Sequence, residues 1–270
     1  MDGRSLYIQI MEKNARYFQN KNNRRMNINK IYNMDCLEGL KQLEDNSIDC
    51  VITDPPYNIA KKGKLIKVGD EITNTFNYFG HYDTYEKDEY LIFIEKIIKQ
   101  LSRVCVNGAN VLIFLGREHI NIIEKIFIEN DFKCKNTIAI IKNNPLPHFR
   151  KNGFRSGFEL GLWLVKGEKP KIFNFLSQEL MINYDNYTIG QKDSTHPNEK
   201  PLHIIKKYMK ILSEKNNVVL DPFMGSGTTA VACKELGRNY IGFELSKEYC
   251  DIAEKRLSKV NNKKLNDWFK

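Results

Sequence analysis

Two short segments that lie far apart in the chain carry residues suited to chemistry on a flat, polar ligand. The first is Asp54-Pro55-Pro56-Tyr57, which follows the apolar run 48–53. Because proline has no N–H to donate, two prolines in succession end a strand sharply. The turn therefore carries a carboxylate before it and an aromatic ring after it, a pairing that can grip a nucleobase. Taken alone, these four residues are explained equally well as an ordinary turn at a strand end.

The second segment is a turn with two glycines between a short apolar run and a predicted helix. It reads Asp221-Pro222-Phe223-Met224-Gly225-Ser226-Gly227-Thr228-Thr229. Glycine lets the backbone approach a ligand closely, and a helix N-terminus offers free N–H groups. Glu244 follows the next predicted strand, about 20 residues further on, where an acidic side chain can bind ribose hydroxyl groups. The third glycine of a dinucleotide motif and the lysine of a phosphate-binding loop are absent, which favours a nucleoside cofactor without a pyrophosphate.

The pattern of apolar residues places both segments at strand ends in an α/β fold. We predict strands at 28–34, 48–53, 110–115, 132–141, 158–165, 218–220 and 240–243, and helices at 36–43, 90–104, 120–128, 201–212, 230–236 and 247–257. Alternating strands and helices indicate crossover connections and parallel pairing. The expected fold is one doubly wound α/β domain with a mixed seven-stranded sheet. Residues 58–85 and 168–199 are expected to be irregular, and Asn107-Gly108 to form a turn.

The composition fits a globular protein with a polyanionic partner. The 270 residues are 41% hydrophobic and carry a formal net charge of +9. Such an excess of Lys and Arg is typical of nucleic-acid-binding proteins, although a basic composition also occurs without such a partner. The six cysteines form no C-x-x-C pair, so we expect reduced cysteines packed in the core of a cytoplasmic protein, without a metal site. No run of residues is apolar enough for a membrane span.

Basic segments outside the predicted core are candidates for contact with nucleic acid. We predict a basic arm over 1–27, a central domain over 28–260 and a polar tail over 261–270. The long loop 58–85 is expected to be mobile and combines lysines with aromatic side chains, which suits a nucleic-acid-facing flap; the alternative is a flexible insertion. Further basic residues follow the proline-rich stretch 143–147 and could also form a solvated face. The candidates are Lys61, Lys62, Lys64, His148, Arg150, Lys151 and Arg155.

Taken together and in this order, the two segments resemble those of the β-class amino-methyltransferases of DNA, which use S-adenosylmethionine. Smaller matches agree with this resemblance over residues 28–258. They are Asn33-Met34-Asp35-Cys36, Asn143-Asn144-Pro145-x-Pro147 with Phe158-Glu159 after it, and His196-Pro197-x-x-Lys200-Pro201. The family resemblance implies a permuted order of motifs, in which the first strand lies beside the last one and the DNA target-recognition region lies within about 143–199.

The resemblance also implies roles for individual residues. Asp54, Pro55, Pro56 and Tyr57 are expected to be catalytic. The residues expected to bind S-adenosylmethionine are Asp35, Cys36, Asp54, His196, Lys200, Asp221, Pro222, Phe223, Gly225, Ser226, Gly227, Thr228 and Glu244. Asp35 could instead only cap the helix after it, and Glu244 could cap the last helix.

The expected reaction is methylation of the N6 amino group of adenine in double-stranded DNA, after the base has been flipped out. Aspartate rather than serine at position 54 favours adenine within the family. N4-cytosine methylation and a catalytically inactive DNA-binding subunit are the alternatives. A homodimer and a cognate restriction endonuclease are partners that the sequence leaves open, as is contact of the arm 1–27 with DNA or a partner subunit.

Replacing Lys61, Lys62 and Lys64 together by alanine should weaken binding to duplex DNA and flatten its salt dependence, because each lysine–phosphate contact releases about one counterion. The measurement is the slope of log affinity against log salt concentration. An unchanged slope would remove this loop from the DNA interface.

Overall fold

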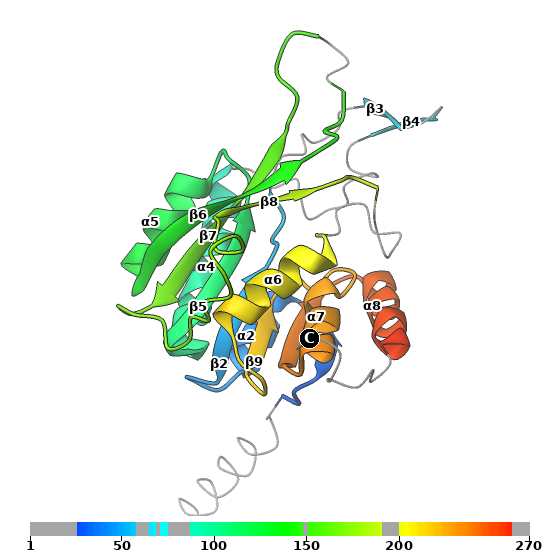
Figure 1. Ribbon diagram of the computed structural model, residues 1–270. Helices are drawn as coiled ribbons and strands as arrows, with labels where there is room; N and C mark the ends of the chain where they lie inside the picture. Colours follow the sequence, from blue (N-terminus) through cyan, green and yellow to red (C-terminus); the bar gives the residue numbers. More distant parts are fainter. Residues whose placement is uncertain are drawn as a thin grey trace, which may run out of the picture.

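A mixed eight-stranded sheet runs through the centre of the fold, in the order β1-β10-β9-β2-β5-β7-β6-β8 (Figure 1). The computed structural model describes residues 26–57, 65–68, 71–74, 87–147, 151–190 and 200–260. The sheet strands are β1 (Lys30–Asn33), β2 (Ile48–Thr53), β5 (Cys105–Leu115), β6 (Phe132–Lys142), β7 (Phe158–Lys166), β8 (Tyr184–Tyr187), β9 (Val218–Asp221) and β10 (Asn239–Glu244). The described helices are α2 (Cys36–Gln42), α4 (Lys87–Val104), α5 (Ile120–Glu129), α6 (Leu202–Leu212), α7 (Thr228–Leu236) and α8 (Lys247–Lys259).

The strand directions confirm the predicted doubly wound, mixed architecture. Strands β1, β10, β9, β2 and β5 pair in parallel, and β7 runs antiparallel to both β5 and β6. The first strand lies beside the last one, with Lys30 opposite Ile241, as the permuted order requires. The predicted strands and helices all occur, with their ends displaced by a few residues.

Three details of the prediction were wrong. The sheet has eight strands rather than seven, because β8 lies within the stretch 168–199 that was expected to be irregular. β8 pairs with β6 at the sheet edge, and its polar sequence lacks the apolar run that marks a buried strand. The expected loop 58–85 contains an antiparallel pair, β3 (Leu65–Val68) and β4 (Glu71–Asn74). Asn107-Gly108 is a register irregularity inside β5 and not a turn between elements, with Gly108 at φ 82°.

Side chains of alternate residues along each central strand enter opposite cores, which is why helices cover both faces of the sheet. Val51 packs with α2, α4 and α5, whereas its neighbours Cys50 and Ile52 pack with α6, α7 and α8. Figure 1 shows these two helix layers on either side of the sheet. All six cysteines are free thiols, and five of them are buried, which confirms the expected core packing. Among the described residues, no helix has the length and apolar character of a membrane span.

Strands β2 and β9 lie side by side at the point where the chain changes its direction of winding. Cys50 is opposite Val219, and Val51 is opposite Leu220. From β2 the chain passes through α4 to β5, whereas from β9 it passes through α7 to β10 on the other side. Such a switch point leaves a crevice at the carboxyl ends of the strands. The turn after β2 and the turn after β9 therefore open into the same space.

Gly39 sits where α2 touches β10, and substitution by alanine should destabilise the protein. An added Cβ would lie 2.4 to 2.7 Å from ring carbons of Phe243, a ring that is fully buried and cannot move aside. Overpacking of this kind costs about 1–3 kcal/mol. Urea unfolding of Gly39→Ala measures the loss, with Gly157→Ala as the control because nothing lies within 4 Å of its added Cβ. Equal stability of the two variants would contradict the packing argument.

Candidate active site

A cavity of about 1090 Å³ opens at the carboxyl ends of β2 and β9. Its lining unites residues that the sequence analysis singled out in separate segments. They are Asp35, Cys36, Asp54, Pro55, Pro56, Tyr57, Arg155, Lys200, Asp221, Pro222, Phe223, Gly225, Ser226, Thr228 and Glu244. The shared lining joins the proline turn and the glycine turn into one site.

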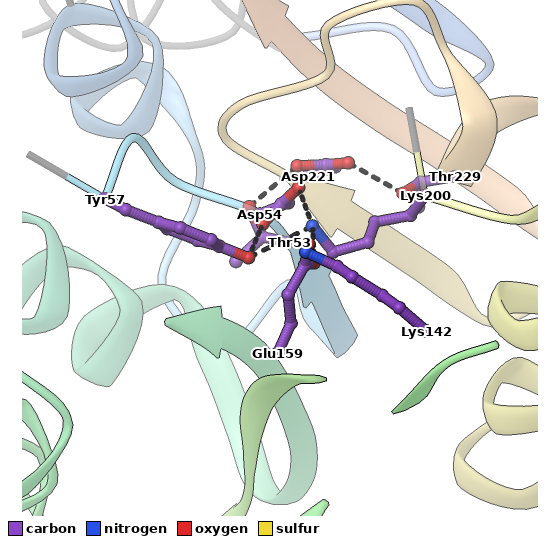
Figure 2. A network of polar contacts seen from close by, with 8 residues as sticks. All are labelled: Thr53, Asp54, Tyr57, Lys142, Glu159, Lys200, Asp221 and Thr229. Carbon is purple, nitrogen blue, oxygen red and sulfur yellow. Dashed lines mark hydrogen bonds and ion pairs between the residues drawn. The ribbon is translucent and has the colours of Figure 1, made fainter. Parts of the chain in front are cut away.

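The carboxylate of Asp54 is held by one partner on each oxygen (Figure 2). The Lys200 ammonium group donates to Oδ2 at 2.6 Å, and the Tyr57 hydroxyl donates to Oδ1 at 2.7 Å. Lys200 also donates to the Tyr57 oxygen at 3.0 Å, which closes a triangle of side chains. Burial raises the pKa of Asp54, and the attraction of Lys200 offsets only part of this effect.

Lys200 joins a second carboxylate to the site. Its ammonium nitrogen lies 3.0 Å from Glu159 Oε2, and Lys142 lies 2.8 Å from Glu159 Oε1. Burial alone would raise the pKa of Glu159, but Lys200 and Lys142 outweigh burial and lower it to about 2. Burial likewise disfavours the charged form of Lys200, yet Asp54, Tyr57 and Glu159 hold its pKa well above the ordinary value. The site therefore keeps a permanent ammonium group between two carboxylates of different basicity.

Asp221 fastens the two strand ends to each other. It accepts hydrogen bonds from the Thr53 hydroxyl at 2.7 Å, from the Thr229 hydroxyl at 2.7 Å and from the Phe223 N–H at 3.0 Å. Burial raises its pKa to about 6 in spite of these donors. The Asp221 carboxylate therefore accepts hydrogen bonds at both turns and holds them together.

Glu244 is held at the end of β10 by backbone N–H groups. Gly225 donates to Oε2 at 2.9 Å, and Ser246 donates to Oε1 at 2.7 Å. The side chain that caps α8 is Ser246 and not Glu244, so the capping alternative for Glu244 is wrong. Each carboxylate oxygen can accept more than one hydrogen bond, which leaves Glu244 able to bind hydroxyl groups in the cavity.

Two predicted residues of the glycine turn, Gly227 and Ser226, have a role in the fold. Gly227 has φ 84° and begins α7, and an added Cβ would lie 2.7 Å from that of Ala253; it is not part of the cavity lining. Ser226 receives hydrogen bonds from Arg256 on α8, to its carbonyl at 2.8 Å and to its hydroxyl at 2.9 Å. These contacts set the shape of the turn.

Asp35 both caps a helix and lines the cavity. Its Oδ1 accepts from the N–H groups of Leu37 at 2.9 Å and Glu38 at 3.1 Å, at the start of α2. The neighbouring Cys36 is mostly buried, and burial raises the pKa of its thiol to about 12. The thiol is therefore neutral near pH 7.

The candidate nucleic-acid-binding residues are described only in part. Arg155 lines the cavity and donates to the carbonyls of Pro145 and Leu146, which holds it against the proline-rich turn. Lys151 is exposed in the loop between β6 and β7 and does not line the cavity. The other candidates, and His196 of the cofactor set, lie outside the described residues: Lys61, Lys62, Lys64, His148 and Arg150.

The sequence analysis missed Glu159 and Lys142 as site residues. Glu159 is the second residue of β7, and Lys142 is the last of β6. The two strands pair antiparallel, with Ile141 opposite Phe158, so these side chains meet only once that pairing exists. The signals available beforehand were that Lys142 directly precedes the asparagine-proline stretch and that Glu159 belongs to the quoted pair Phe158-Glu159.

A doubly wound sheet with an acidic turn and a glycine turn at its switch point is typical of enzymes that bind a nucleoside-containing ligand there. The family model described as DNA methylase, of the N6 and N4 type, matches residues 48–255. The chain belongs to this family of DNA methyltransferases.

Individual relatives agree with the family. The type II methyltransferase M.HinfI of Haemophilus influenzae is 33% identical over 250 residues, which are 86% of this chain and 69% of the relative. A type II methyltransferase of Moraxella bovis is 30% identical over 245 residues, 85% of this chain and 88% of the relative. The M1.HpyAVI–SAM complex matches with TM-score 0.64 and 31% identity, over 84% of this chain and 98% of that one. The cytosine-N4-specific PvuII methyltransferase shares the fold, with TM-score 0.70 and 18% identity, over 87% of each chain.

The low pKa of Glu159 should make the stability of the protein depend on pH in the acid range. Because the pKa falls from 4.5 to about 2 on folding, the stabilisation is fully present above pH 4.5 and is lost as the pH falls towards 2. About 1 kcal/mol should be gone by pH 3.5. Urea unfolding between pH 6 and 3.5 should therefore show a shallower pH dependence for Glu159→Gln than for the wild type.

The control is Glu168→Gln, which breaks an exposed ion pair of 2.6 Å with Lys133 that solvent screens. Asp221 acts in the opposite direction, because its raised pKa favours the protonated form on folding, but it is present in both proteins and cancels. Parallel pH profiles for Glu159→Gln and the wild type would contradict the assigned ion pairs.

Proposed function

We propose that this protein transfers a methyl group from S-adenosylmethionine to the N6 amino group of adenine in duplex DNA. The observation that carries the proposal is the fixed carboxylate of Asp54 at the end of β2. It shares one cavity with the glycine turn and with Glu244. The family membership supports the reaction class, and aspartate at position 54 supports adenine as the base.

The chemistry requires a nitrogen lone pair that is available for attack. In adenine this lone pair is delocalised into the ring, so the amino group is a poor nucleophile. Asp54 and the carbonyl of Pro55 would accept its two N–H bonds and favour a pyramidal nitrogen. Tyr57 would stack on the base, and Pro56 would fix the turn that carries both side chains. When bound, S-adenosylmethionine supplies an electrophilic methyl group.

The chain's residues fit this cofactor. A nucleoside with a positive sulfonium and no phosphate calls for acceptors of hydroxyl groups and for a negative lining. Glu244 keeps acceptor capacity beyond its two backbone donors, and Asp35, Asp54 and Asp221 add carboxylates to the same cavity. The M1.HpyAVI structure was solved as a complex with SAM. The backbone at Gly225 and Phe223 would form the wall against the cofactor.

Exposed basic residues near the cavity support DNA as the substrate. The exposed Arg155, which lines the cavity, and the exposed Lys151 in the same loop would contact phosphates while the target base is flipped into the cavity. We assign target recognition to about 143–199 and DNA contact to the loop 58–85. Because the relatives are type II methyltransferases, a cognate restriction endonuclease and a second copy of the chain are the partners to test.

Product analysis tests the reaction. Incubation with methyl-labelled S-adenosylmethionine and unmethylated duplex DNA, followed by digestion to nucleosides, should yield labelled N6-methyldeoxyadenosine. N4-methyldeoxycytidine as the sole product would overturn the adenine assignment. Absence of transfer together with absence of a thermal shift by the cofactor would favour an inactive DNA-binding subunit.

Replacement of Asp54 by alanine should lower the rate of transfer by about 10²–10³-fold or more, because it removes an acceptor aimed at the reacting nitrogen. The affinity for S-adenosylmethionine, measured by calorimetry, should change little. Glu244→Gln is the matched variant, since it should weaken cofactor binding more than it slows transfer at saturation. Loss of cofactor binding in Asp54→Ala would make Asp54 a cofactor ligand and not the acceptor for the base.

A further inference from the structure

Four charged side chains of alternating sign form a succession of ion pairs that ends at the Asp54 carboxylate (Figure 2). Lys142 lies 2.8 Å from Glu159, Glu159 lies 3.0 Å from Lys200, and Lys200 lies 2.6 Å from Asp54. The exposed fraction of the side chain is 16% for Lys142, 19% for Glu159, 10% for Lys200 and 26% for Asp54. Lys142 comes from β6, Glu159 from β7, Lys200 from the segment before α6 and Asp54 from the turn after β2. Only Asp54 and Lys200 had a predicted role, and Lys200 was expected to face the cofactor.

The Lys200 ammonium group makes two hydrogen bonds and one further ion pair. An ammonium group carries three N–H bonds. Its nitrogen lies 2.6 Å from Asp54, 3.0 Å from Tyr57 and 3.0 Å from Glu159, and the last contact is an ion pair with poor hydrogen-bond direction. Without Glu159, the buried Lys200 ammonium group would be paired with the Asp54 carboxylate alone. Its flexible four-carbon stem would then let the ammonium group take up other positions. The position of the charge beside Asp54 therefore depends on a residue that does not touch Asp54.

We propose that Glu159 is a positioning residue for methyl transfer: it anchors the Lys200 ammonium group against Asp54 Oδ2, so that Asp54 meets the target amino group as a fixed carboxylate. The inference rests on the proposed function but holds for either amino group, adenine or cytosine. Lys142 completes the arrangement, because it binds the other oxygen of Glu159 and fixes its orientation.

The two carboxylates, Asp54 and Glu159, have different roles when the amino group loses a proton. The nitrogen lone pair forms the new N–C bond, and the electrons of the broken C–S bond stay on sulfur. One N–H proton must then leave. Asp54, whose pKa is raised by burial, is the better acceptor, whereas Glu159 with a pKa of about 2 stays ionised. Glu159 thus holds Lys200 charged, and Asp54 exchanges the proton.

The charges around Asp54 predict opposite effects of two neutral substitutions. Asp54 faces Tyr57 on its own turn, Lys200 before α6, Glu159 on β7 and Asp221 on β9. Lys142 on β6 contacts the other oxygen of Glu159, and Tyr187 on β8 interacts electrostatically with Glu159, Lys200 and Asp54. Glu159 raises the pKa of Asp54, and Lys200 lowers it. Glu159→Gln should therefore move the acid limb of the pH–rate profile to lower pH, and Lys200→Met should move it to higher pH.

The experiment measures single-turnover rates of methyl transfer between pH 5 and 9 for the wild type and the variants. We expect Glu159→Gln to lower the rate at least about tenfold, because a small displacement of a reacting group has large effects, while affinity for DNA and cofactor changes less than about twofold. Lys200→Arg retains the charge and should keep the acid limb near that of the wild type. Glu235→Gln is the control, since it breaks a partly buried 2.6 Å pair with Lys206 between α7 and α6.

The outcomes separate this inference from the proposed function. Absence of transfer by the wild type would overturn the proposed function. Transfer by the wild type with acid limbs that stay in place, or that move in the same direction in Glu159→Gln and Lys200→Met, would overturn the positioning role. A Glu159→Gln rate equal to that of Glu235→Gln would do the same. Thermal unfolding of each variant, with Lys200→Arg as the variant that retains charge, distinguishes loss of positioning from loss of folding.

Discussion

The hydrogen bond from Thr53 to Asp221 joins two parts of the chain on which everything else in the site depends. One partner ends β2 and the other ends β9, and these strands are neighbours only because the sheet is wound in both directions from this point. The residue after Thr53 is Asp54, and the residues after Asp221 form the glycine turn. This buried contact, together with the backbone pairing of β2 with β9, fixes the position of Asp54 relative to the glycine turn. The Thr229 hydroxyl of α7 donates a hydrogen bond to the same carboxylate, which connects the N-terminus of this helix to the strand ends.

The pKa values of the carboxyl groups in the site depend on both burial and ion pairing. Burial disfavours the charged form of each group, and ion-pair partners overcome this effect at some groups and not at others. Glu159 has two ammonium partners and stays strongly acidic, whereas Asp54 shares one of them and becomes more basic. Glu244, by contrast, has only backbone donors, and burial raises its pKa. Three carboxylates near one cavity therefore differ in basicity for reasons that can be traced to named neighbours.

The sequence predicted those parts of the site that depend on local structure. A proline pair ends a strand wherever it stands, and glycines with positive φ shape a turn from within, so Asp54, Gly225 and Glu244 could be placed from their own neighbourhoods. Glu159 and Lys142 could not, because their meeting requires the antiparallel pairing of β6 with β7. The contact of Lys200 with Asp54 could not be predicted either, because it depends on how the segment before α6 packs against the turn after β2. β8 was missed because a polar edge strand is defined by its backbone partner and not by its side chains.

The hydroxyl of Tyr57 occupies an oxygen of Asp54 that the target amino group would use. In the proposed reaction the amino group would replace this hydroxyl, so that one intramolecular donor leaves and one intermolecular donor arrives. The number of hydrogen bonds on Asp54 would then be conserved, and that carboxylate would gain little net binding energy from capturing the base. A preference for one base over another would come from terms that the exchange does not cancel: the stacked area against the tyrosine ring and the volume that the cavity offers.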